Sequence, residues 1–313
     1  MGIQTATYAI ALSIAASAWA TPAAPEEKPP EVLIEATIER GGDFLAFGFD
    51  SLWMMSGRKL VRINPDDNSV TDIPIEGAVG SYRGISIGEG AVWVPDVGSK
   101  TIYKVDPRAN KIVLQIPSLL FDSEGSIGVG EGAVWAVTGS NGQILARYDA
   151  QNGNEVAKVP LPSASSGVVA DFGSVWVTGT AKSELYRVDP KTNQIVTTTA
   201  LNPEPRFLTS GEGSIWVLNQ GDGTVQRIDG KTGEVLATIE ADAAGEGGDI
   251  AVGGGFVWLS TILVPVIRID PNTNSFSGKF KRPSGVYLGD AIRYGDDSLW
   301  ISGNSIFRIK PPG

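Results

Sequence analysis

The segment Gly211-Glu212-Gly213-Ser214-Ile215-Trp216-Val217 decides the fold, because its pattern returns seven times along the chain. In each copy a tryptophan follows a turn that carries Gly or Asp and lies in a short apolar run. Successive copies are 40 to 42 residues apart, and a period of this length made of short strands is typical of one propeller blade. The sequence therefore predicts an all-β, seven-bladed β-propeller with four-stranded antiparallel blades. The seven tryptophans are Trp53, Trp93, Trp135, Trp176, Trp216, Trp258 and Trp300.

A basic residue follows each of these tryptophans within twelve positions and usually precedes an apolar residue and Asp. Residues at one repeat position usually serve one task within each repeat, such as pairing with a nearby turn carboxylate. We therefore expect a structural role for these residues rather than a functional cationic ring. They are Arg62, Lys104, Arg147, Arg187, Arg227, Arg268 and Arg308.

The last copy of the repeat is short by one strand. Residues 290–310 supply three strands, and the sequence ends at Gly313. Residues 36–39, Ala-Thr-Ile-Glu, repeat residues 237–240, which occupy a fourth-strand position. We therefore predict that residues 31–39 complete the last blade, so that the propeller spans residues 31–313 and leaves no open sheet edge.

Composition excludes several classes of function. The 313 residues contain no histidine, which rules out Ser-His-Asp and Cys-His catalysis and His-ligated zinc. They contain no cysteine, so stability has to come from packing rather than from disulfides. A net charge of −10 argues against nucleic acid and against an anionic membrane surface as partners.

The first twenty residues predict a signal peptide. Residues 8–18 form an apolar run that is too short to span a bilayer, and Ala18-Trp19-Ala20 is a typical cleavage signal. Residues 21–30, rich in Ala, Pro and Glu, are expected to form a linker. We predict a periplasmic or secreted monomer with no transmembrane segment in the mature chain. The alternative is an uncleaved hydrophobic anchor, since no Lys or Arg precedes the apolar run.

Candidate functional residues are those that break the repeat on the channel face. Before the innermost strands lie Arg83 and Arg206, which could clamp an anionic group or pair with neighbouring carboxylates. The carboxylates there could line the channel and hold Ca²⁺ or Mg²⁺, or form a solvated acidic rim. They are Asp43, Glu124, Asp249 and Asp290.

The loops between second and third strands add further candidates. Asp96 and Asn219 are polar loop residues, whereas Ile262-Leu263-Val264-Pro265 is apolar and either exposed for a contact or buried by packing. Tyr82 and Tyr287 could form an amphipathic rim or fill space between blades. The predicted ligand-binding residues are Arg83, Asp96, Glu124, Arg206, Asn219, Asp249, Tyr287 and Asp290, and no catalytic residue is predicted.

The unit G-x-G-x-V/I-W-V followed by R-I-D-P-x-T-N/G-x-V resembles the exported propellers related to streptogramin lyase (virginiamycin B lyase) and the YVTN/NHL-type repeats. It is seen here in residues 211–217 and 227–235. The resemblance implies a lyase that uses Mg²⁺ with histidine and glutamate, but this chain has no histidine to take those positions. Related sugar-lactone hydrolases use Glu, Asn and Asp around Ca²⁺, and no motif here places those ligands.

Two hypotheses remain. The favoured one is an exported, non-catalytic binding or protein-interaction module that holds a periplasmic protein, peptide or small ligand on its channel face, with no cofactor expected. The alternative is a Mg²⁺- or Ca²⁺-dependent lyase or hydrolase that uses the channel carboxylates.

Overall fold

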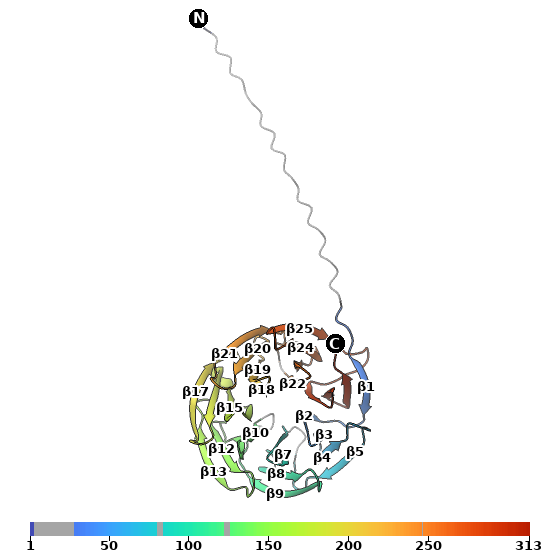
Figure 1. Cartoon of the computed structure of the whole chain (residues 1–313), viewed down its shortest axis with the longest axis vertical. Helices are drawn as coiled ribbons and strands as arrows, with labels where there is room; N and C mark the ends of the chain where they lie inside the picture. Colours follow the sequence, from blue (N-terminus) through green and yellow to red (C-terminus); the bar gives the residue numbers. More distant parts are fainter. Residues whose placement is uncertain (3–27, 80–83, 122–125, 246) are drawn as a thin grey trace.

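The chain folds into a ring of seven four-stranded antiparallel sheets, which confirms the predicted propeller (Figure 1). The computed structural model describes residues 1–2, 28–79, 84–121, 126–245 and 247–313. Within each blade the first strand lies nearest the channel and the fourth lies on the rim. The helical content of the described residues is one 3₁₀ turn, Thr180–Lys182, and none of their helices is long and apolar enough to cross a membrane.

The blades are numbered in chain order, each from channel to rim. Blade 1 contains β2 (Asp43–Gly48), β3 (Ser51–Ser56), β4 (Lys59–Ile63) and β5 (Val70–Pro74). Blade 2 contains β6 (Ser86–Gly88), β7 (Ala91–Asp96), β8 (Thr101–Asp106) and β9 (Lys111–Pro117). Blade 3 contains β10 (Ile127–Gly130), β11 (Ala133–Thr138), β12 (Ile144–Asp149) and β13 (Glu155–Pro160). Blade 4 contains β14 (Val168–Asp171), β15 (Ser174–Gly179), β16 (Glu184–Asp189) and β17 (Gln194–Ala200).

The remaining blades follow the same order. Blade 5 contains β18 (Pro205–Gly211), β19 (Ser214–Asn219), β20 (Thr224–Asp229) and β21 (Val235–Glu240). Blade 6 contains β22 (Asp249–Gly253), β23 (Phe256–Ser260), β24 (Val266–Asp270) and β25 (Ser275–Phe280). Blade 7 contains β26 (Ala291–Gly295), β27 (Ser298–Ser302), β28 (Ile306–Lys310) and β1 (Leu33–Ile38).

The ring closes as the sequence predicts, with β1 pairing antiparallel to β28 as the outermost strand of blade 7. The chain ahead of β1 also contacts blade 6, since the Val32 N–H donates to the Lys281 carbonyl at 3.0 Å. At the other end of the chain, Arg268 donates to the Pro312 carbonyl at 2.6 Å. Both ends of the propeller therefore lie on the rim, where Figure 1 shows them close together and away from the channel.

The repeated tryptophans form the core of every blade. All seven are at most 1% exposed, and each indole N–H donates to the carbonyl of the residue five positions earlier, in the turn that begins its strand. The ring packs between sheets while its one polar group is satisfied by backbone, which is the arrangement that a buried indole needs. The repeat therefore reflects a structural requirement of each blade.

Six of the seven basic residues link one blade to the next. All except Arg268 stack on the tryptophan of their own blade at 4.9 to 5.5 Å, whereas Arg268 stacks on Phe256 and Phe280. The outer end of each side chain except Arg187 then donates to a backbone carbonyl of the following blade, as when Arg227 donates to the Pro271 carbonyl at 2.6 Å. Arg187 donates to Ser174 of its own blade. The structural role predicted for these residues is confirmed, but their main partner is a backbone carbonyl rather than a turn carboxylate.

Candidate functional site

Two phenylalanines meet across the channel. The rings of Phe44 in blade 1 and Phe207 in blade 5 have centroids 6.4 Å apart and are tilted by 40°. Since blades 1 and 5 are not neighbours in the ring, this contact spans the channel. The residue at this position lies two before the one that pairs with the blade's tryptophan, and in the other blades it is small or short: Gly84, Ser126, Gly167, Asp249 and Ala291.

A β-bulge begins the innermost strand in both of these blades. The register shifts between Asp43 and Leu45 in β2 and between Pro205 and Phe207 in β18. Phe44 has a φ of 52°, a strained conformation for a bulky residue, and its N–H donates to Asp43 Oδ1 at 2.9 Å. Bulges re-aim side chains and are common beside functional sites. Here they direct aromatic and charged side chains to the channel.

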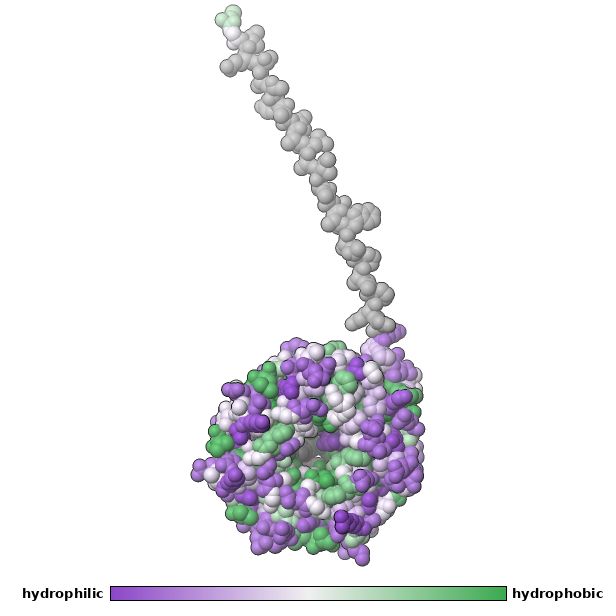
Figure 2. All heavy atoms as spheres, viewed as in Figure 1, coloured by the Kyte–Doolittle hydropathy of each residue, from purple (hydrophilic) through white to green (hydrophobic). Residues whose placement is uncertain are grey.

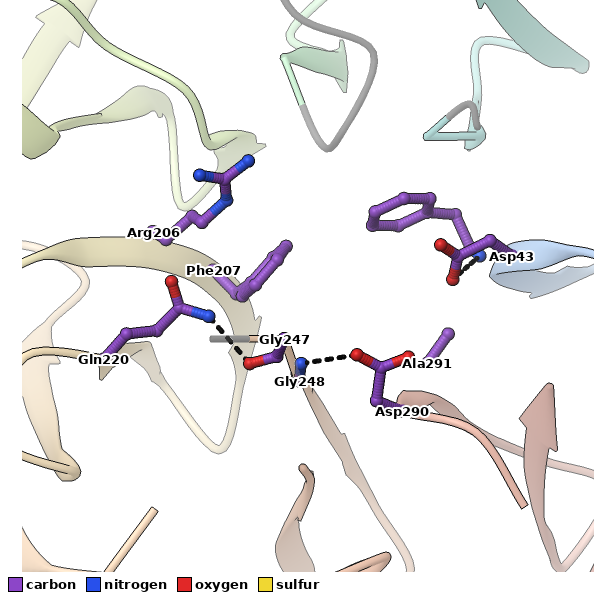
Figure 3. A pocket seen from close by; sticks show the side chains of 9 residues that line it. Asp43, Arg206, Phe207, Gln220, Gly247, Gly248, Asp290 and Ala291 are labelled. Carbon is purple, nitrogen blue, oxygen red and sulfur yellow. Dashed lines mark hydrogen bonds between the residues drawn. The ribbon is translucent and has the colours of Figure 1, made fainter. Parts of the chain in front are cut away.

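The residues around this pair form a cavity of about 310 Å³, called the mouth cavity below. Figure 3 shows Arg206 and Gln220 on one side of it and Asp43 and Asp290 on the other, with Phe207 nearer the middle. Arg206 holds its guanidinium 5.7 Å from the centre of the Phe207 ring, and Gln220 donates to the Gly247 carbonyl at 2.7 Å. The lining residues are Asp43, Phe44, Arg206, Phe207, Gln220, Gly247, Gly248, Asp290 and Ala291.

Two further cavities share lining residues with the mouth cavity. A cavity of about 360 Å³, called the seam cavity, shares Asp43 and Asp290 with it and lies between blades 7 and 1. A narrower cavity of about 160 Å³ shares Phe44, Arg206 and Phe207 with it and follows the channel. The space-filling view shows the corresponding hollow at the centre of the ring (Figure 2). The three cavities are therefore adjacent at the mouth of the channel.

Four of the predicted ligand-binding residues line these three cavities. Arg206 and Asp290 line the mouth cavity, Tyr287, which is 47% exposed, lines the seam cavity, and Asp249 lines the channel cavity. Arg83 and Glu124, together with Tyr82, lie outside the residues that the structure describes. The repeat-breaking residues of blades 5 and 7 thus come together with Asp43 of blade 1.

Asp96 and Asn219 serve their own loops instead. The carboxylate of Asp96, 1% exposed, accepts hydrogen bonds from the Val79 N–H at 2.7 Å and from the Ser99 hydroxyl at 2.9 Å. The amide of Asn219 is fully buried and donates to Thr224 Oγ1 at 3.0 Å and to Gln226 Oε1 at 3.1 Å. Neither residue lines any of these three cavities.

Asp249 lines the narrow channel cavity, but its carboxylate is engaged by protein groups. It forms an ion pair with Arg293 and accepts hydrogen bonds from the Ile250 N–H at 2.8 Å and the Ile292 N–H at 3.2 Å. Burial raises the pKa of Asp249, and Arg293 opposes this rise. Arg293 stands opposite Trp300, where the other blades carry smaller residues such as Ala46 and Gly128. The ion pair of Asp249 and Arg293 is therefore part of the packing between blades 6 and 7.

Replacing Arg293→Gln is expected to lower the free energy of unfolding by about 2–3 kcal/mol at neutral pH, because Asp249 then stays buried without a counter-charge. A carboxyl with a raised pKa in the folded state contributes most stability below its ordinary pKa, and this contribution falls as pH rises through the raised value. The loss of unfolding free energy in Arg293→Gln should therefore be larger at about pH 8 than at about pH 4.5. Urea unfolding at both pH values checks this, and an equal loss at both would contradict it.

The described residues contain no cluster of three or more Asp or Glu side chains placed to hold a metal ion. The acidic residues of the channel face lie in two separate places instead. Asp249 is paired with Arg293, whereas Asp43 and Asp290 stand at the boundary of the mouth and seam cavities. A metal ion at that boundary would need most of its oxygen ligands from water or ligand.

Several site residues that belong to no sequence motif do depart from the repeat. Phe44 and Phe207 are aromatic at a repeat position that is otherwise small, and Arg293 is charged at a position that is otherwise small. The apolar loop of residues 262–265 shows both alternatives expected of it, exposure for a contact and burial by packing. Leu263 is 83% exposed, whereas Val264 packs against the core of blades 5 and 6.

The fold and this site define a seven-bladed β-propeller with a charged, aromatic cavity at the mouth of its channel. The ring resembles a streptogramin B lyase structure, with a TM-score of 0.74, 18% identity and coverage of 90% of this chain and 96% of that one. It also resembles virginiamycin B lyase from Staphylococcus aureus, with a TM-score of 0.71, 16% identity and coverage of 88% and 98%. A catalytically inactive form of that lyase with quinupristin is similar as well, with a TM-score of 0.74, 16% identity and coverage of 90% of this chain and 99% of that one.

Residues 140–251 match the family model described as outer membrane protein assembly factor BamB. A comparison with curated proteins finds no match. At these identities the similarity establishes the propeller fold, and the expected resemblance to the lyase-type propellers is confirmed at that level.

Proposed function

We propose that this chain is an exported, non-catalytic binding propeller that holds a peptide or a peptide-like part of a partner in the mouth cavity. The observation that carries the proposal is the mouth cavity itself, which forms where blades 1 and 5 break the repeat with bulges and with an aromatic pair across the channel. Pockets that combine apolar surface with a few convergent polar groups are the usual places for ligands.

The charges of the mouth support a polar, peptide-like ligand. Arg206 suits a carboxylate or a backbone carbonyl, and the Asp290 side suits a donor, while Phe207 offers apolar surface between them. Two comparisons agree with a binding role. One similar propeller is a lyase with quinupristin, and the family model that matches residues 140–251 describes an assembly factor.

The metal-dependent lyase or hydrolase remains the competing function. It is less well supported, because Asp249 is engaged by Arg293 and two backbone N–H groups, and the sequence contains no histidine for lyase chemistry of the related enzymes. Thermal melting with Mg²⁺ or Ca²⁺ separates the two. A rise in melting temperature that disappears in Asp290→Asn would favour the enzyme.

The binding role is tested with the tripeptide Gly-Phe-Gly, in free, N-acetylated and C-amidated forms, by isothermal titration calorimetry. At least one form should bind, and Phe207→Ala should weaken it by about tenfold or more because the aromatic surface of the mouth is lost. Phe276→Ala, on the outer strand β25 and 43% exposed, is the matched control and should leave binding unchanged. Absence of binding by all forms would overturn the proposal.

A further inference from the structure

Glycines expose bare backbone along half of the seam cavity's lining. Five of its ten lining residues are glycines, namely Gly41, Gly42, Gly57, Gly289 and Gly303. The cavity joins the segment that follows β1 to the loops of blade 7, and the Gly42 N–H donates to the Gly303 carbonyl at 3.0 Å across it. A ligand here can therefore approach the main chain closely at the point where the ring closes.

Its charged side chains are carboxylates, and Asn304 adds an amide that can donate or accept. The carboxylates of Asp43 and Asp290 stand on the wall shared with the mouth cavity. Asp290 Oδ2 accepts a hydrogen bond from the Gly248 N–H at 2.9 Å, and among the described residues no hydrogen-bond partner is seen for Oδ1. One carboxylate oxygen with its charge is thus left for a ligand.

A buried hydroxyl provides a second, independent indication. Ser302 lines the seam cavity, is 1% exposed, and its Oγ has no hydrogen-bond partner among the described residues. Leaving a buried hydroxyl unpaired costs about 1–3 kcal/mol, so such a group points to a missing partner. Ser260 occupies the same place at the end of the second strand in blade 6, is likewise unpartnered, and does not line the seam cavity.

Negative charge and spare oxygen acceptors indicate a positively charged donor. A primary ammonium carries three N–H donors and no acceptor, which fits a site with few oxygens. Ca²⁺ takes six to eight oxygen ligands and Mg²⁺ takes six, which this set does not supply from side chains. Tyr287 at the outer edge already carries the Arg282 guanidinium 5.7 Å from its ring centre, so Asp290, whose Oδ1 has no hydrogen-bond partner among the described residues, is the charged group left for the ligand.

We propose that the seam cavity binds the free amino end of a short peptide, with Asp290 as the counter-charge and Ser302 as a hydrogen-bond partner. The remainder of the peptide then lies in the mouth cavity, where Phe207 contacts an apolar side chain and Arg206 faces a carboxylate from the opposite side (Figure 3). This inference rests on the proposed binding function and names its ligand class: a peptide with an unblocked amino terminus.

The test compares Gly-Phe-Gly with N-acetyl-Gly-Phe-Gly on the full chain by isothermal titration calorimetry. The free amine should bind about tenfold more tightly or better, because acetylation removes the charge that Asp290 pairs with. Asp290→Asn and Ser302→Ala should each reduce that preference to within about threefold, and Ser260→Ala should retain it. Thermal melts of the three variants show that each is folded.

The outcomes separate this inference from the function beneath it. Equal affinity for the two peptides, with binding still weakened by Phe207→Ala, would overturn the amino-end site and leave the mouth as the binding site. A preference that survives both Asp290→Asn and Ser302→Ala would overturn the seam as its location. Mg²⁺ or Ca²⁺ binding that both substitutions abolish would replace the ammonium with a metal ion. Absence of binding by any peptide form overturns both proposals.

Discussion

Deletion of residues 31–39 is expected to abolish cooperative folding of the whole propeller, although it removes a single outer strand. The deletion takes away β1 and exposes the edge of β28, which pairs with β1 at five positions. It also removes Val32 and Ile38, which are at most 8% exposed and belong to two different core clusters. Each such side chain contributes about 1.5–3 kcal/mol and each hydrogen bond about 1 kcal/mol. The total is comparable with the 5–15 kcal/mol that stabilises a typical domain.

Far-UV circular dichroism and thermal melting check this, with a synthetic peptide of residues 28–40 added to the truncated chain. The peptide should restore a cooperative melt, since it replaces the missing strand in the same register. Glu31→Ala is the matched control, because it breaks only the exposed ion pair with Lys281, 3.5 Å long, and should cost no more than about 1 kcal/mol. A native melt for the truncated chain alone would show that the ring does not depend on this closure.

Replacing Trp216→Ala is expected to cost about 3–5 kcal/mol of unfolding free energy. The indole is fully buried, and its removal leaves a large cavity between blades 5 and 6. It also removes the ring on which Arg227 stacks at 4.9 Å and the acceptor interaction of the Gly211 carbonyl at 3.1 Å. Arg227 would then keep its bond to the Pro271 carbonyl without the aromatic support beneath it.

Urea denaturation of Trp216→Ala and Trp258→Ala, measured side by side, checks this loss of unfolding free energy. Both indoles are buried, but Arg268 stacks on Phe256 and Phe280 rather than on Trp258. Trp258 instead makes an edge contact with Phe256, whose ring centroid lies 5.5 Å away, and such a pair is worth about as much as the cation–π contact of Trp216. The two variants should therefore lose stability to within about 1 kcal/mol of each other, and a larger difference would show that one of these contacts dominates.

The sequence predicts those features that every blade repeats. The period of the tryptophans sets the blade count, and the strand missing from the last copy locates the closure, which the structure confirms in the pairing of β1 with β28. The structural role of the basic residues could be predicted for the same reason, because a position shared by all blades serves the blade. Their carbonyl partners could not, since the partner lies more than forty residues away in the next blade.

The site depends on single departures from the repeat and could be predicted only in part. Asp43 and Asp290 are far apart in the sequence and share a cavity wall only because the ring closes. The bulges that aim Phe44 and Arg206 at the channel change one register position, which hydrophobic periodicity does not report. The sequence alone predicts a channel carboxylate at Asp249, because the ion pair with Arg293 forms only when blades 6 and 7 pack together.

The closure also imposes an order in time. A chain that emerges from its N-terminus carries β1 without a partner until residues 306–310 have followed it. The seam cavity also forms late, because Gly41 and Gly42 come from the beginning of the propeller and Ser302 and Gly303 from its end. A chain cut short anywhere before blade 7 would lack half of the cavity wall. Occupation of the seam would thus mark a molecule whose synthesis has passed blade 7.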